Sequence, residues 1–294
     1  DCFDVIEINS TFYRQPDPKV ARSWVSRVSS KSSFLFTAKL CQVFTHVRTG
    51  SLISRNHPAS ASDPPDLQAE ARLYLAGIEP LLQSGRLGVI LMQFPHAFHD
   101  RPECRAHIET LVETLPGLPL VAEFRHRSWN NEGALAFLRD LGVGFCNIDQ
   151  PTLGATLPPT AHVTSRLGYV RLHGRNAANW FAPRDGAAAA EAGGGRGAPG
   201  RAGARYDYLY SMEELRPWAE RARSIAARAE EVFIIANNHY RGKGPANALM
   251  LKSALEGRRV EAPAGLVAAY PDLKETADPV DTKRRQAPRQ GRLF

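Results

Sequence analysis

Polar and charged side chains stand at the ends of seven short apolar runs, and their types could carry acid–base and anion-binding chemistry. The candidate catalytic groups are three carboxylates and one histidine, namely Glu7, Glu123, Asp149 and His173. The candidate substrate-binding residues are Asn9, Lys39, Gln93, Arg125, His126, Trp129, Arg171, Asn237 and Asn238. A carboxylate base, a histidine that titrates near neutrality or binds a metal, and cations that stabilise negative charge together predict chemistry on an anionic substrate.

The alternation of side chains along three of these runs places several of the candidates on one face. Glu7 in VIEIN and Glu123 in VAEFR stand between apolar neighbours, and Arg171 and His173 are two residues apart in YVRLHG. Because successive side chains of a strand point to opposite faces, we expect each of them on the inward face of its strand. The two glutamates could form an acid–base pair, or one of them could hold an arginine such as Arg125, which is the usual fate of a buried carboxylate.

Strands and helices must alternate to position these side chains, because the apolar runs are separated by amphipathic stretches, as in repeated βαβ units. The predicted strands cover residues 3–9, 34–40, 87–94, 118–124, 143–149, 168–174 and 231–238. Helix starts are marked by Asp17 before Pro18 and by the capping pair Ser211 and Glu214. We expect a helix in each of the six crossovers and a last helix near residues 245–256.

The order of these elements predicts an α/β fold, a TIM-type (β/α)8 barrel that lacks its first strand. Seven strands are found where the barrel needs eight, and we expect the first one upstream of Asp1. In such barrels the chemistry lies at the C-terminal ends of the strands, where the polar side chains are found. We expect the barrel over residues 1–256, with a flexible low-complexity insertion at residues 183–204, a long loop at 47–65 and a disordered basic tail over 257–294.

Composition limits the class of protein. A chain of 294 residues with 43% hydrophobic content suits one barrel domain, and the net charge of +7 with a pI near 9.4 favours anionic partners. The four cysteines include no CxxC pair, which argues against a zinc ribbon or a disulfide framework and indicates a reducing cytoplasm. No apolar run reaches the roughly 18 residues of a membrane span, so no membrane partner is expected.

Several blocks of the sequence together resemble one protein family. They are EINSTFY (7–13), FTAKL (36–40), MQFP (92–95), AEFRHRSW (122–129), YVRLHGR (169–175), YDYLYS (206–211) and NNHYRGKGPANAL (237–249). The resemblance is to the domain of unknown function 72 family, also called YecE-like. It implies a TIM barrel whose first strand carries a Gly-Thr-Ser-Gly-Trp-like segment, and it matches all thirteen candidate residues named above. It implies no particular reaction, because none is established for the family.

The leading hypothesis is an enzyme that uses acid–base chemistry on a phosphorylated or nucleic-acid-derived substrate. A second hypothesis is a metal-dependent phosphodiesterase, analogous to barrel endonucleases of DNA repair, with Glu7, Glu123, Asp149, His173 and His239 as ligands. It would need a divalent metal, which the first does not require. A glycosidase with two carboxylates is a third, although the surrounding cations suit a neutral sugar poorly. The last is a non-catalytic module that binds a ligand or DNA.

The end of the chain carries a separate partner hypothesis. Gln290, Gly291, Arg292, Leu293 and Phe294 resemble the Q-x-x-L-F peptide that docks bacterial repair and replication proteins on the DNA sliding clamp. A short disordered segment would order on binding, with Leu293 and Phe294 in an apolar pocket and Gln290 at its rim. The alternatives are an ordinary frayed terminus, or a tail that packs back on the barrel.

Overall fold

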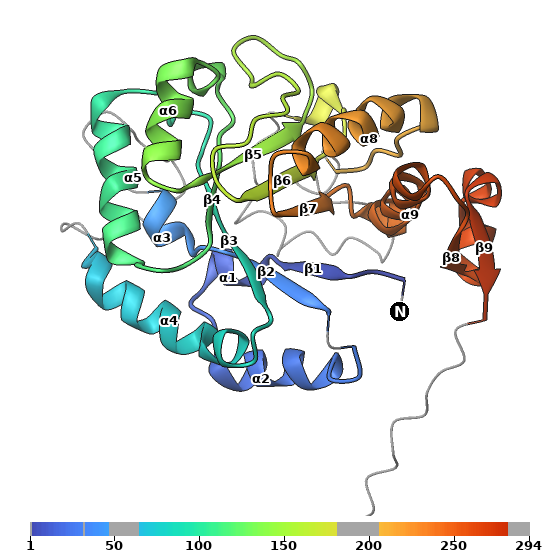
Figure 1. Ribbon diagram of the computed structural model, residues 1–294, viewed down its shortest axis with the longest axis horizontal. Helices are drawn as coiled ribbons and strands as arrows, with labels where there is room; N and C mark the ends of the chain where they lie inside the picture. Colours follow the sequence, from blue (N-terminus) through green and yellow to red (C-terminus); the bar gives the residue numbers. More distant parts are fainter. Residues whose placement is uncertain (1, 32, 47–64, 181–205, 282–294) are drawn as a thin grey trace, which may run out of the picture.

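Seven parallel strands form the centre of the molecule in the computed structural model, which describes residues 2–31, 33–46, 65–180 and 206–281 (Figure 1). The strands are β1 (Val5–Ile8), β2 (Leu35–Lys39), β3 (Leu87–Gln93), β4 (Leu120–Glu123), β5 (Gly144–Asp149), β6 (Leu167–Leu172) and β7 (Glu231–Ala236). They neighbour one another in chain order. All seven predicted strands are confirmed, and the fold is a nearly closed parallel barrel flanked by helices.

Helices cover the outside of the barrel (Figure 1). They are α1 (Ser10–Tyr13), α2 (Pro18–Arg27), α3 (Gln42–Thr45), α4 (Leu67–Gln83), α5 (Pro102–Thr114), α6 (Glu132–Asp140), α8 (Met212–Ala226) and α9 (Lys243–Glu256), with 3₁₀ turns η1 (Arg127–Trp129), η2 (Ala177–Asn179) and η3 (Tyr240–Gly242). The predicted start signals are confirmed. Asp17 accepts a hydrogen bond from Lys19 N at 2.7 Å, and Ser211 and Glu214 form a capping box. None of the described helices is long and apolar enough to span a membrane.

The connection between β5 and β6 corrects one expectation, because residues 150–166 contain no helix. This segment lies instead on the outer face of β5, where the Asn147 side chain holds it. Asn147 Oδ1 accepts hydrogen bonds from Thr160 Oγ1 at 2.8 Å and from His162 N at 2.7 Å. Pro158 and Pro159 stand in the middle of the segment, and proline removes the backbone donors that a helix interior requires.

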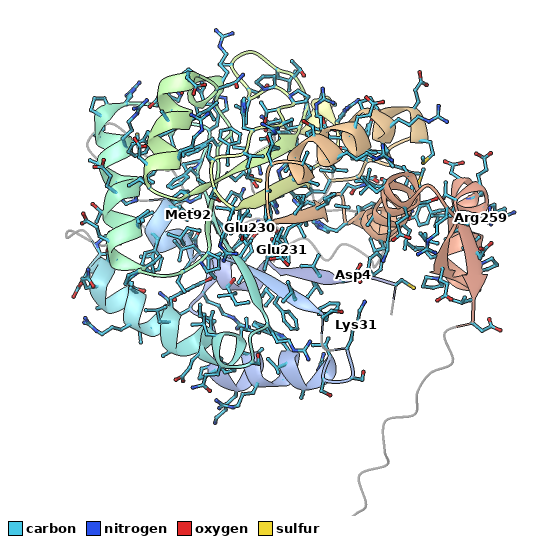
Figure 2. The ribbon with its side chains drawn as sticks, in the orientation of Figure 1. Asp4, Lys31, Met92, Glu230, Glu231 and Arg259 are labelled. Atoms are coloured by element: carbon cyan, nitrogen blue, oxygen red, sulfur yellow. The ribbon has the colours of Figure 1, made fainter. Side chains whose placement is uncertain are left out.

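The residues after α9 correct a second expectation. Much of the region expected to be disordered forms β8 (Val260–Pro263), α10 (Ala264–Ala269), η4 (Pro271–Glu275) and β9 (Ala277–Val280). The two strands pair in parallel beside α9 (Figure 1). Leu273 and Val267 are buried there, and Arg259 Nε lies 2.7 Å from Asp278 Oδ1. Figure 2 labels Arg259 in this unit. The Pro-rich, charged composition concealed these apolar anchors. Residues 282–294, the insertion at 183–204 and nearly all of the loop at 47–65 lie outside the described residues.

Aromatic rings fill the barrel interior near the N-terminal ends of the strands. The Phe233 ring of β7 reaches across to Gly88 of β3, where an added Cβ would come within 2.6 Å of the ring. Tyr169 of β6 lies 6.0 Å from Phe233 between ring centroids. The polar side chains at the C-terminal ends of the strands are therefore next to an apolar layer inside the barrel.

Candidate active site

Arg171 of β6 lies at the centre of the barrel and joins three strands. Its Nη2 lies 2.6 Å from Glu7 Oε1 of β1, and its Nη1 donates to Glu123 Oε2 of β4. The Tyr169 hydroxyl donates to Glu7 Oε2 at 3.0 Å and also lies at hydrogen-bond distance, 2.9 Å, from the Thr37 hydroxyl. All three charged side chains face inward, as the alternation predicts. Burial of these charges is tolerated because each is paired.

Glu123 is fully buried and has further partners besides Arg171. Its Oε1 lies 2.5 Å from Arg125 Nη2 and 3.4 Å from His173 Nε2. Burial alone would raise the pKa of Glu123, but Arg125 and Arg171 outweigh this effect and hold the pKa well below its usual range. Glu123 is therefore an ionised anchor at neutral pH, which makes it a poor general base.

His173 is fully buried two residues after Arg171. The Asn237 amide Nδ2 donates to His173 Nδ1 at 3.0 Å, an assignment that leaves the proton of the neutral ring on Nε2. Burial lowers the pKa of His173 well below its usual value, and Arg125 and Arg171 add to this effect against Glu123. His173 is thus a neutral imidazole of one tautomer at pH 7, and not a group that titrates near neutrality.

Lys39 ends β2 with its side chain in the barrel and only 9% of its surface exposed. Its carbonyl accepts hydrogen bonds from Thr11 Oγ1 at 2.7 Å and from the Tyr74 hydroxyl at 2.9 Å. Its Nζ lies 5.6 Å from the Phe12 ring centroid, and within the described parts of the chain it has no hydrogen bond or ion pair. Burial lowers the pKa of Lys39 to about 7, with help from Arg171, although Glu7 and Glu123 act in the opposite sense.

Arg125 and Trp180 form the rim above these residues. The Arg125 side chain is 12% exposed, and its guanidinium lies 5.6 Å from the Trp180 ring, which is 6.2 Å from the His173 ring. Gln93 of β3 is level with Glu123 in the strand register and almost buried. Sequence reasoning missed Trp180, which stands seven residues beyond His173 after a turn. Its only signal was an aromatic residue soon after a strand end. We call Glu7, Lys39, Glu123, Arg125, Arg171 and His173 the central cluster.

Asp149 does not belong to the central cluster, although the sequence places it at a strand end. Cys146 of the same strand faces the interior, where its Sγ lies 3.9 Å from Glu123 Oε2. Asp149, three residues later, therefore points to the opposite face of β5. Asp149 Oδ2 instead accepts from Arg175 Nε at 2.9 Å, and Arg175 also pairs with Glu214 of α8 at 3.2 Å. Burial raises the pKa of Asp149, against the effect of Arg175. This second cluster ties β5 and β6 to α8.

Trp129 and Asn238 have structural contacts and also lie away from the central cluster. The Trp129 indole is fully buried in a stack with Phe124, at 4.0 Å between centroids, and donates to the Phe98 carbonyl at 2.8 Å. Asn238 Nδ2 donates to the Tyr208 carbonyl and to Asn247 Oδ1, both at 2.7 Å. These contacts hold the polypeptide around the barrel and leave neither side chain free to bind a substrate.

His126 and Asn9 lie at the outer edge of the mouth. The His126 ring stacks on His99 at 3.7 Å between centroids, and its Nδ1 accepts from Ser128 N at 3.1 Å. Burial, together with His99 and His96, lowers the pKa of His126 to about 4. Asn9 is exposed just before α1. Gln290, Leu293 and Phe294 lie outside the described residues.

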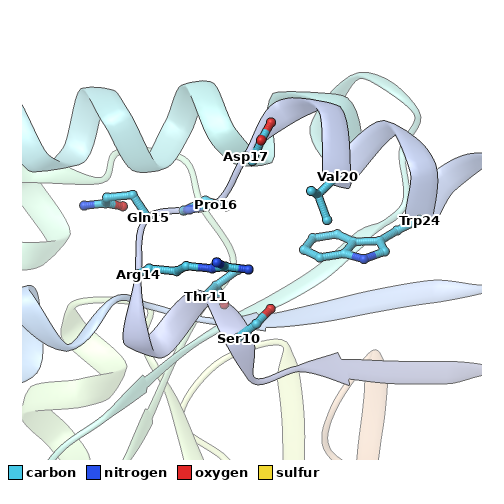
Figure 3. Close-up of a pocket in the computed structure, with 8 residues that line it drawn as sticks. All are labelled: Ser10, Thr11, Arg14, Gln15, Pro16, Asp17, Val20 and Trp24. Carbon is cyan, nitrogen blue, oxygen red and sulfur yellow. The ribbon is translucent and has the colours of Figure 1, made fainter.

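A pocket of about 180 Å³ opens beside the turn between α1 and α2 (Figure 3). Figure 3 shows the side chains of Arg14 and Trp24 pointing toward one another across it. Thr11 lines this pocket and also holds the Lys39 carbonyl, so the pocket lies behind the end of β2. The central cluster itself lies inside the barrel, on the other side of the backbone.

Comparison with known proteins gives one family. Residues 1–269 match the family model described as protein of unknown function DUF72. The chain is 25% identical to the UPF0759 protein YunF of Bacillus subtilis (strain 168) over 261 residues, which cover 86% of this chain and 84% of that protein.

Two crystal structures have a similar fold. A DUF72 family protein from Thermotoga maritima MSB8 has 32% identity and a TM-score of 0.68, with 86% of this chain and 85% of that chain covered. A DUF72 family protein from Enterococcus faecalis V583, at 22% identity and a TM-score of 0.69 over the same shares, supports the fold alone. Since the family model spans most of the sequence, the chain belongs to the DUF72 family of proteins of unknown function.

Proposed function

We propose that the mouth of the barrel is the active site of an enzyme that binds a small anionic substrate and moves protons on it. The observation that carries this proposal is the buried Lys39 ammonium, which has no ion-pair partner in the described parts of the chain. An unpaired buried charge is costly, so it is retained where a ligand supplies the opposite charge.

The charges of the central cluster support an anion. Lys39, Arg125 and Arg171 are three cations, and among the described residues the carboxylates that they face are Glu7 and Glu123. Both carboxylates already contact Arg171, which leaves one positive charge uncompensated. A phosphate or carboxylate group of the substrate would restore the balance, next to Lys39 and to the N–H groups that Arg125 has left beside its contacts with Glu123 and Gln150.

The geometry supports positioning roles for the two glutamates, whereas the sequence predicted catalytic ones. Glu7 and Glu123 hold Arg171, and their oxygens are occupied, so we assign them positioning roles. Arg171 is fully enclosed by this pairing, which leaves Lys39 and Arg125 as the anion-binding cations. His173 remains the candidate hydrogen-bond donor to negative charge that develops on the substrate, because Asn237 fixes its neutral tautomer and directs an N–H group into the interior.

The metal-dependent alternative lacks a ligand set among the residues that the structure describes. No three His, Cys, Asp or Glu side chains come together there in a way that could hold a metal ion. Asp149 lies in the second cluster, and the Nδ1 atom of His239 is 3.0 Å from the Asn237 carbonyl. The acid–base proposal therefore has more support than a metal-dependent phosphodiesterase.

Anion binding and turnover test the proposal together. We expect phosphate, sulfate or a sugar phosphate to stabilise the protein by about 2.7 kcal/mol at 100 times its Kd. Lys39→Met should abolish the rise in melting temperature, whereas Lys31→Met should retain it. Each anion that stabilises the protein is then incubated with it, and its conversion to product is followed by NMR. The His173→Gln variant should convert it more slowly. The proposal fails if no anion stabilises the protein, or if Lys39→Met responds like the wild type.

A second, non-catalytic proposal rests on the terminal residues Gln290, Leu293 and Phe294. Their resemblance to the Q-x-x-L-F clamp-binding peptide, and the nearby basic residues Lys283, Arg284, Arg285 and Arg289, support recruitment to a bacterial DNA sliding clamp. This proposal concerns recruitment and is independent of the barrel site. Titration of the tail peptide against a bacterial sliding clamp tests it.

A further inference from the structure

We infer that Lys39 is a nucleophile, whose amine condenses with an aldehyde or ketone of the anionic substrate to form a Schiff base. The inference rests on the proposed function and deepens it, because it adds a carbonyl group to the substrate class.

The backbone of Lys39 is held in place from two sides. Thr11 Oγ1 of α1 and the Tyr74 hydroxyl of α4 both donate to its carbonyl, at 2.7 and 2.9 Å. The side chain therefore leaves a fixed point at the C-terminal end of β2, on the inward face of the barrel. A nucleophile needs such support, since small errors of placement are costly to the rate.

The two carboxylates that act electrostatically on Lys39 form ion pairs with arginines and not with Lys39. Glu7 pairs with Arg171, and Glu123 pairs with both Arg171 and Arg125. An ion-paired lysine is held as the ammonium, which has no lone pair to react. Lys39 has only the Phe12 ring beside its Nζ in the described structure, a weaker contact than an ion pair.

The surroundings of Lys39 favour its neutral, reactive form. Burial, Arg171 and Arg125 lower the pKa of Lys39, while Glu7 and Glu123 raise it, and the result is a pKa of about 7. Roughly half of the molecules then carry the free amine at pH 7. A lysine with the ordinary pKa of about 10.4 is neutral in fewer than one molecule in about a thousand at that pH. Desolvation is one of the established ways to activate such an amine.

The condensation is a balanced step that needs no further reactant. The Nζ lone pair forms a bond to the carbonyl carbon, and the carbonyl oxygen takes up a proton to give a carbinolamine. This intermediate loses its oxygen as water, using the protons that leave nitrogen, and a C=N bond remains. The imine nitrogen then takes up one proton from solvent, and the protonated Schiff base carries the same charge as a lysine ammonium. It can therefore remain beside an anionic group held by Arg125.

Reductive trapping with glyoxylate, an aldehyde that carries a carboxylate, tests the inference. The full chain is incubated with glyoxylate and sodium cyanoborohydride near pH 7, and each modified lysine is located by peptide mass spectrometry. We expect Lys39 to be modified at least about tenfold faster than Lys31 and Lys252, which are both paired with Asp4 at 2.9 Å. Figure 2 shows Lys31 and Asp4 near the start of the chain.

Matched controls separate a reactive site from an accessible amine. Acetaldehyde, which has no anionic group, should show a smaller preference for Lys39 than glyoxylate does, and millimolar phosphate should slow modification by glyoxylate. Lys39→Arg keeps the positive charge, so it should fold normally and show only the slow modification of the other lysines. The rate at Lys39 should rise with pH to a plateau, with its midpoint near the pKa of about 7.

The outcomes distinguish this inference from the proposed function. Modification of Lys39 at the rate of Lys31 or slower overturns the Schiff base, whereas an equal preference with acetaldehyde overturns the anionic substrate class. If phosphate still stabilises the protein through Lys39 in the first case, the anion site stands and Lys39 acts only as a charge. If phosphate binding also fails, both proposals fall.

Discussion

Arg171 and Glu123 form an ion pair at the centre of the barrel, and neither side chain is exposed to solvent. The two residues come from β6 and β4, which are not neighbours in the sheet, so the pair crosses the interior. Glu7 completes the arrangement from β1. This arrangement links strands that share no backbone hydrogen bonds, and it decides which polar groups remain available to a ligand.

We predict that Arg171→Met strongly destabilises the fold. The substitution leaves Glu7 and Glu123 buried without their shared cation, and breaking a buried pair in this way costs about 3–5 kcal/mol. Urea unfolding measures the free-energy change. Arg139→Met is the control, because it removes only an exposed partner of Glu132 and should have little effect. Equal stability of Arg171→Met and the wild type would show that the interior pair is not formed.

We predict that Lys39→Met stabilises the protein at neutral pH by an amount on the order of a few kcal/mol. The pKa of Lys39 is lowered to about 7 in the folded state, mainly by burial, so the unfolded chain binds a proton more tightly. The resulting penalty is complete below pH 7 and disappears as the pH rises to about 10.4, the unfolded value. Unfolding curves from pH 6 to 10 should therefore converge for the two proteins. A constant difference across that range contradicts the burial of the ammonium.

We predict that stability falls in acid, through His173 together with other histidines of lowered pKa such as His126. Burial lowers the pKa of His173, so below about pH 6.5 the unfolded chain takes up a proton that the folded protein does not. Below about pH 4.3 Glu123 adds to the loss, because its folded-state pKa is held down by Arg125 and Arg171 against the effect of burial. Each such group contributes up to about 1.4 kcal/mol per pH unit. His173→Gln should flatten the slope between pH 6.5 and 4.5, and an unchanged slope would assign it to other groups.

We predict that the tail peptide from Asp281 to Phe294 binds a bacterial DNA sliding clamp. Leu293 and Phe294 would supply the apolar contacts, and Gln290 the hydrogen bond. Fluorescence titration measures the affinity, and the peptide with both Leu293→Ala and Phe294→Ala is the control. No binding at concentrations on the order of 100 µM, about −5 kcal/mol, or equal binding by the control, removes the proposal.

Local sequence signals determined the strands, the helix starts and the inward face of the main site residues. The seven strand predictions and the capping box of Ser211 and Glu214 depend on neighbouring residues alone, and the structure confirms them. The same period of two places Glu7, Glu123 and Arg171 in the interior. Composition, in contrast, misled the reading of residues 260–280, because a few buried apolar side chains suffice to order such a short unit against α9.

Only the tertiary structure decided which polar groups meet and in which protonation state. Arg171 lies 164 residues from Glu7 in sequence, and no local pattern shows that it neutralises both Glu7 and Glu123. That pairing leaves Lys39 as the cation without an ion-pair partner in the described central cluster. The neutral His173 and the lowered pKa of Lys39 follow from burial and from the fields of Arg125 and Arg171. These effects depend on distances across the barrel interior, whereas the strands themselves depend on residues next to one another in the chain.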